Sequence, residues 1–206
     1  FGNGESSSPS NSKKQPNAEF PVFTIRDMVR AQYQLLIQQK GISHVLAIVG
    51  GSMGGMQVFE WIVQYPDFMD KAVPYVSSPR LTTIDRLRQR SQVELIDLGL
   101  RNAAATDTLI GLVSMIQHMA SFSPAYFIEN APSAEFENYW QKTLASGIRK
   151  NVYDYAAQLR AMLPHDITRP QGGSWAKTAA AIQAETLIIV CRQDMTLSPA
   201  PSLQLA

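Results

Sequence analysis

Apolar residues in this chain of 206 residues gather into short continuous runs in some places and recur at helical spacing in others. Runs of strand length occur at 45–49, 71–76 and 186–191. The first and last are continuously apolar, which is the pattern of parallel strands buried on both faces. Pro74 stands inside the second run, although proline is rare inside sheets. Three parallel strands are therefore predicted.

A helix is predicted on each side of the first of these strands. Apolar positions recur at helical spacing after Thr24, a good N-cap, and continue to about Lys40, so one helix is predicted there. A second helix is predicted from about Met53 to Gln64, before Pro66. Residues 1–19 are rich in glycine, serine, proline and asparagine and have no apolar period, which predicts a long loop or disorder.

For the roughly hundred residues between the second and third strands, the sequence pattern predicts only helices and loops. They contain apolar stripes at helical spacing, which are typical of helix packing. The stripes comprise Leu109, Leu112, Val113, Ile116 and Met119; Phe136, Trp140 and Leu144; and Tyr153, Ala156, Leu159, Met162 and Leu163. We therefore predict an α/β core from residues 1–82 and 185–206, with 83–184 inserted as a helical cap.

A G-x-S-x-G pattern joins the first predicted strand to the helix that follows it. Ser52 is its serine, between Gly50 and Gly54. A strand-to-helix turn this sharp holds the serine in strained dihedrals and exposes its hydroxyl, the arrangement called a nucleophile elbow. Side chains at 50 and 54 are expected to collide, which explains the glycines. The backbone N–H of Met53 is expected to face a developing oxyanion.

Other glycine motifs do not fit the same segment. A dinucleotide fingerprint starting at Gly50 or Gly51 needs glycine at 52 or 53, where Ser52 and Met53 stand. A phosphate-binding loop needs a Gly-Lys ending, and no lysine occurs between Lys40 and Lys71. Nucleotide binding is therefore disfavoured.

Composition excludes several classes of function. The formal net charge is +1, and no basic run suggests a nucleic-acid partner. No apolar stretch is long enough for a membrane span, so no membrane partner is expected and a cytoplasmic location is predicted. The single cysteine, Cys191, is predicted to be a buried, inert thiol, and no metal site is expected. The first residue is Phe1, and 203–206 resemble an unfinished helix, which suggests a fragment.

A serine nucleophile needs a base and an acid that orients it, in the chain order Ser, Asp or Glu, then His. Asp194 follows the third strand, where the acid is expected. The three histidines, His44, His118 and His165, all precede it. Three explanations stay open: the base lies beyond residue 206, His118 or His165 replaces it, or the protein is not a catalyst.

Residues 20–32, Gly41-Ile42, the segment 50–56 and Glu60-Trp61 together resemble the homoserine O-acetyltransferase family of the α/β-hydrolase superfamily. The likeness is dense over 20–80, thin through the cap, and returns at 156–166 and 193–199. It implies an α/β-hydrolase fold, a parallel sheet with helices on both faces and an inserted helical cap. It also implies that Ser52 accepts the acyl group and that Asp194 is the triad acid.

One part of the cap departs from that family. The family uses an arginine of the first cap helix to grip the substrate carboxylate, and the equivalent position here holds Val93. Arg80, Arg88 and Arg90 are nearby candidates for substrate binding, or they form a solvated helix face. This departure bears on the identity of the acceptor and not on the serine chemistry.

Together these features predict a serine-nucleophile O-acyltransferase that works through an acyl-enzyme. Its partners would be a small-molecule acyl donor and acceptor, with acetyl-CoA or another acyl donor as substrate, no bound cofactor, and a homodimer as one possible assembly. Two alternatives stay open: an esterase that uses water as acceptor, and a non-catalytic module for binding or scaffolding.

Overall fold

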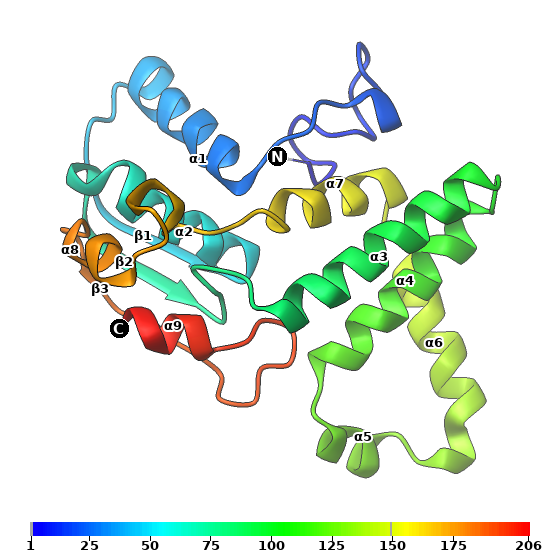
Figure 1. The fold of residues 1–206 in the computed structure, drawn as a ribbon. Helices are drawn as coiled ribbons and strands as arrows, with labels where there is room; N and C mark the ends of the chain where they lie inside the picture. Colours follow the sequence, from blue (N-terminus) through cyan, green and yellow to red (C-terminus); the bar gives the residue numbers. More distant parts are fainter. Residues whose placement is uncertain (1, 149) are drawn as a thin grey trace. The chain divides into compact units, whose positions relative to one another are not determined.

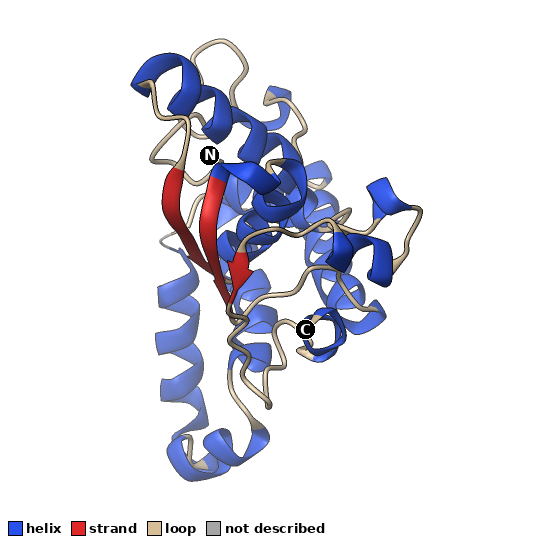
Figure 2. Ribbon diagram, turned by 90° about the vertical axis from the view of Figure 1, so that its left-hand side faces the viewer, coloured by secondary structure: helices blue, strands red, loops and turns tan. Residues whose placement is uncertain are grey.

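The computed structural model describes residues 2–148 and 150–206, and it contains a parallel sheet (Figure 2). Its strands are β1 (Val45–Gly51), β2 (Met69–Tyr75) and β3 (Glu185–Thr186), in the order β1-β2-β3. β1 and β2 pair from Val45 opposite Met69 to Gly51 opposite Tyr75, so both strands end at the same edge. The predicted parallel sheet is confirmed.

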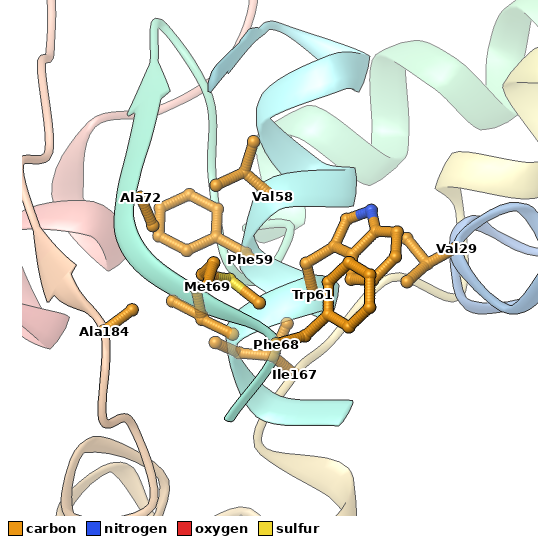
Figure 3. Close-up of a cluster of buried hydrophobic side chains, with 10 residues drawn as sticks. Val29, Val58, Phe59, Trp61, Phe68, Met69, Ala72, Ile167 and Ala184 are labelled. Atoms are coloured by element: carbon orange, nitrogen blue, oxygen red, sulfur yellow. The ribbon is translucent and has the colours of Figure 1, made fainter. Parts of the chain in front are cut away.

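Helix α1 (Ile25–Gln34) begins where the sequence predicts it. Thr24 caps it through a reciprocal pair of hydrogen bonds with Asp27, and a π-helical turn (Leu35–Gln39) continues it. Helix α2 (Met53–Gln64) follows the glycine-rich turn directly. The main core joins side chains of α1, α2 and β2 with three from turns and loops (Figure 3). It comprises Val29 of α1; Val58, Phe59, Trp61 and Ile62 of α2; Met69 and Ala72 of β2; and Phe68, Ile167 and Ala184.

The strands are less buried than their apolar sequences predict. Leu46 and Val49 of β1 are 71% and 63% exposed, and Leu187 and Ile189 after β3 are 59% and 47% exposed. β3 itself spans two residues, followed by a single bridge from Ile189 to Tyr75. Among the described residues β1 pairs with β2 alone, so an apolar run does not ensure cover on both faces. Cys191 is exposed, which corrects its prediction as a buried thiol.

The structure divides into two compact units. The sheet unit comprises Phe23–Thr83, Pro164–Arg192 and Leu197–Ala206, and it includes α8 (Trp175–Ala180) and α9 (Ala200–Leu205). The helical unit comprises Phe1–Val22, Ile84–Leu163 and Gln193–Thr196. Short 3-10 turns lie at Asn17–Glu19, Pro66–Phe68, Ser133–Glu135 and Arg169–Gln171.

The helical unit contains the helices predicted between the second and third strands (Figure 1). They are α3 (Thr83–Arg101), α4 (Thr106–Ser121), α5 (Pro124–Asn130), α6 (Phe136–Ile148) and α7 (Val152–Met162). Helices α3, α4 and α7 share a core of Val93, Ile96, Leu109, Ile110, Val113, Val152, Ala156 and Leu159. Not every predicted stripe residue is buried, since Met119 and Phe136 are both 61% exposed.

Residues 2–19 form a loop that is attached to α7. The backbone N–H and the hydroxyl of Ser10 donate to the two carboxylate oxygens of Asp154, at 2.9 and 2.6 Å. Ser8 is fully buried and accepts a hydrogen bond from the N–H of Gly4. The loop prediction is confirmed, and its contacts with α7 give it a defined path.

None of the helices in the described residues combines the length and the apolar character that a membrane crossing requires.

Candidate active site

The turn between β1 and α2 has the geometry of a nucleophile elbow. β1 ends at Gly51, α2 begins at Met53, and Ser52 alone joins them with φ 52° and ψ −120°. A non-glycine residue with positive φ costs about 1–3 kcal/mol and persists only where the surroundings enforce it. Ser52 is also exposed. The structure therefore gives this serine the strained, accessible position that its sequence pattern predicts.

Only one of the two motif glycines, Gly50, occupies a position where a side chain would not fit. A Cβ at Gly50 would lie 2.5 Å from the carbonyl oxygen of Gly54, which is far inside contact distance. A Cβ at Gly54 would meet nothing within 4 Å. The prediction that side chains at both positions would collide is wrong for Gly54, because Gly50 packs against the backbone of residue 54 and not against its side chain.

Met53 is the first residue of α2. The first N–H groups of a helix have no partner within the helix and carry the positive end of its dipole. The N–H of Ser52 is occupied, since it donates to the carbonyl oxygen of Tyr75 at 3.1 Å. Oxyanion binding by the N–H of Met53 agrees with this geometry and stays a prediction.

Asp194 lies in a loop of the helical unit. Its Oδ1 accepts the backbone N–H of Thr196 at 2.7 Å. Arg88 of α3 holds the same loop, because its guanidinium donates to the carbonyl oxygens of Met195, at 2.7 Å, and of Thr196. Ser52 and Met53 belong to the sheet unit. The pairing of Asp194 with the serine therefore stays a prediction.

The three candidate arginines each have a partner within the protein. Burial lowers the pKa of Arg88, whose guanidinium is engaged by the 194–196 loop. Arg90 forms an ion pair with Glu94 on the exposed side of α3. The guanidinium carbon of Arg80 lies 4.4 Å from the ring centre of Trp175, in the sheet unit. These contacts give structural roles, and substrate binding by the arginines stays a prediction.

Two histidines of the sheet unit are unsuited to be the base for Ser52. His165 is 3% exposed, and its Nε2 lies 3.1 Å from the carbonyl oxygen of Ser78. His44 directly precedes β1, so the 7 residues of that strand separate it from Ser52, a distance of about 25 Å along extended chain. The third, His118 of the helical unit, pairs its Nε2 with the hydroxyl of Tyr139 at 2.6 Å.

Sequence reasoning did not find Ser77, which follows β2. Its hydroxyl donates to the carbonyl oxygen of Ser52 at 2.7 Å. The signal was present in the sequence: Ser77 and Ser78 directly follow an apolar run, at the carboxyl end of a parallel strand, where functional groups of α/β sheets gather. Within residues 2–148 and 150–206, no cluster of His, Cys, Asp and Glu is suited to a metal ion.

Comparison with known proteins identifies the family. The profile of the alpha/beta hydrolase fold matches residues 1–202. A protein named "Probable acyltransferase" from Methanothermobacter thermautotrophicus is 30% identical over 198 residues, which is 95% of this chain and 59% of that protein. The chain thus spans about three fifths of that relative's length. It belongs to the α/β hydrolase fold family.

One further sequence relative and one solved structure agree with this assignment. Homoserine O-acetyltransferase from Pelobacter propionicus is 58% identical over 67 residues, covering 32% of this chain and 18% of that enzyme. The solved structure of the acetyl esterase MekB superposes with a TM-score of 0.86 at 23% identity, covering 97% of this chain and 61% of that one. The resemblance to homoserine O-acetyltransferases is confirmed, and the esterase supports the fold.

Proposed function

We propose that the protein transfers acyl groups through an acyl-enzyme formed on Ser52. The observation that carries the proposal is the exposed serine held at φ 52° between β1 and α2. Support comes from the family and from relatives named as an acyltransferase and homoserine O-acetyltransferases. A strained turn of this kind is retained because it presents the nucleophile.

The chemistry follows from groups at the turn. Ser52 Oγ attacks the acyl carbonyl carbon while its proton passes to a base. The N–H of Met53 donates to the resulting oxyanion, and the donor's leaving group departs with a proton. The acyl group then passes to a hydroxyl acceptor, and Ser52 regains its proton. The base would be an imidazole that Asp194 orients. His44 and His165, the histidines of the sheet unit, are unsuited to this role.

Acetyl-CoA is the proposed donor and a homoserine-like hydroxyl compound the proposed acceptor, by analogy with the named relatives. Hydrolysis differs only in that water accepts the acyl group. Of the three candidate arginines, Arg88 is the least available to a substrate carboxylate, since its guanidinium already binds two carbonyl oxygens.

The test assays the full-length protein with acetyl-CoA and homoserine, and separately with p-nitrophenyl acetate. Turnover with both, an acetyl group on Ser52 in mass spectra, and a loss of about 10⁴-fold or more in Ser52→Ala would support transfer. Ester cleavage without transfer would leave only the esterase. Absence of both activities would favour the non-catalytic module.

Ser43→Ala provides a matched control. Ser43 is an exposed serine of the sheet unit that precedes β1, so it lies at the other end of that strand from Ser52, and the proposal gives it no part in the reaction. Its variant should keep the wild-type rate. An equal loss in both variants would mean that Ser52→Ala acts through general damage to the fold.

A further inference from the structure

The chain turns back toward the elbow immediately after β2. The turn is made by Val76, whose φ is 40°. A β-branched residue rarely adopts a positive φ, and doing so costs about 1–3 kcal/mol. Ser52 has positive φ as well, and its N–H donates to the carbonyl oxygen of Tyr75, the residue before Val76. One hydrogen bond therefore connects Ser52 to the peptide group between Tyr75 and Val76.

After the turn at Val76, the side chain of Ser77 lies against the backbone of Ser52. Ser77 is 4% exposed, and its hydroxyl donates to the carbonyl oxygen of Ser52 at 2.7 Å. A Cβ at Gly55 of α2 would lie 2.4 Å from the Cβ of Ser77. Position 55 must therefore lack a side chain for Ser77 to reach this carbonyl.

Other elements of the sheet unit hold Ser77 in place. The buried hydroxyl of Ser202, in α9, donates to the carbonyl oxygen of Ser77 at 2.7 Å. The next carbonyl, that of Ser78, lies 3.1 Å from Nε2 of the buried His165. Two contacts from distant parts of the chain thus restrain the two residues, which offsets the strain at Val76.

We propose that Ser77 is a positioning residue for acyl transfer at Ser52, acting by polarising the peptide group between residues 52 and 53. The carbonyl oxygen that accepts the Ser77 hydroxyl and the N–H of Met53 belong to this one peptide group. A hydrogen bond at the carbonyl end strengthens donation at the N–H end, by about 10–30% per bond. This inference rests on the proposed function, in which that N–H binds the oxyanion.

Loss of the Ser77 hydroxyl should change kcat and not KM. The oxyanion exists only in the transition state and the tetrahedral intermediate, so a weaker Met53 donor lowers kcat and leaves KM unchanged. Losing a whole oxyanion donor costs about 10²–10³-fold. Losing its polarisation removes about 10–30% of that free energy, so kcat should fall by about 2- to 8-fold. The helical N–H of Met56 also donates to this carbonyl, at 3.1 Å, and stays in place.

The experiment compares Ser77→Ala with Ser78→Ala in the full-length protein. Ser78 is fully buried, but its hydroxyl donates to the carbonyl oxygen of Arg80, away from the elbow. Both variants lose one buried hydroxyl, so both should be destabilised similarly, as measured by urea unfolding. Only Ser77→Ala should lower kcat for p-nitrophenyl acetate at constant KM.

A second readout does not depend on turnover. Phenylboronic acid forms a tetrahedral anionic adduct with a reactive serine, which needs the same donor as the oxyanion. Its inhibition constant should rise in Ser77→Ala by about the factor that kcat falls, and should stay unchanged in Ser78→Ala. Equal kcat and equal inhibition in both variants would overturn the proposal.

Ser77→Cys covers the case in which Ser77→Ala does not fold. The thiol is a weak donor of similar size, so kcat should still fall while KM holds, and wild-type kcat would overturn the proposal. The outcomes separate the two claims. An active wild type with no specific effect at Ser77 rejects this inference alone, whereas a wild type without any Ser52-dependent activity rejects the proposed function.

Discussion

Ser52 shows how much of a reactive site is decided by backbone conformation. The residue is an ordinary serine by type, yet φ 52° and its place between β1 and α2 leave its hydroxyl exposed. Sequence predicts this position well, because G-x-S-x-G between a strand and a helix permits few conformations. The contact from Ser77 was not predictable in the same way, since it depends on the turn at Val76.

The two motif glycines should respond differently to substitution. Gly50→Ala should lower the free energy of unfolding by about 2–3 kcal/mol, because the new Cβ would press on the carbonyl oxygen of Gly54. Gly54→Ala has open space and a helical position, so it should leave stability unchanged or raise it by up to about 1 kcal/mol. Urea unfolding of the two variants checks this, and equal losses would contradict it.

At the scale of elements, helices α1 and α2 were predictable because their signals are local. Thr24 caps α1 as the sequence indicates, and α2 spans Met53–Gln64 as predicted. The third strand was predicted over residues 186–191, and the structure forms a strand at Glu185–Thr186, with one further bridge at Ile189. Strand pairing depends on a neighbour that the strand's own sequence does not specify, which explains the difference.

Helices α4 and α6 should lose stability in acid through His118. Burial lowers the pKa of its imidazole from the ordinary value of 6.5. The unfolded chain therefore takes up the proton first as pH falls through about 6.5, and stability declines until pH drops below the pKa of the folded state. In the protonated imidazole both ring nitrogens are donors, so Nε2 can only donate to the hydroxyl oxygen of Tyr139.

This effect can be isolated with His118→Phe, which keeps an aromatic ring beside Phe122 and Phe127. Between about pH 7.5 and pH 5, wild-type stability in urea should fall more than that of the variant. Phe127→Leu serves as the control, because it alters the same aromatic cluster without removing a titratable group, and it should keep the wild-type slope. Identical slopes for wild type and His118→Phe would refute the assignment.

At the scale of the whole molecule, β1 exposes two large apolar side chains of the sheet unit. Leu46 and Val49 are 71% and 63% exposed, and among the described residues β1 pairs with β2 alone. An apolar strand with an unpaired edge promotes association between copies. A polypeptide limited to residues 1–206 should therefore self-associate and be poorly soluble.

Size-exclusion chromatography with light scattering tests this expectation. Replacing Leu46 and Val49 together by lysine should increase the monomer fraction, because charge on an edge strand opposes pairing. Ile128→Lys is the matched control, since Ile128 is 81% exposed in the helical unit and should change little. Monomeric wild-type material with a cooperative thermal transition would contradict the prediction.

The sequence by itself determined the α/β class, the position of Ser52 and the helices around it, because these depend on short-range rules of spacing, capping and turn geometry. Only the tertiary structure decided which glycine is required by space, which strands are exposed, and that Ser77 and Arg88 hold the backbone near Ser52 and Asp194. Such contacts join residues that are distant in sequence, and their formation depends on packing that no local pattern encodes.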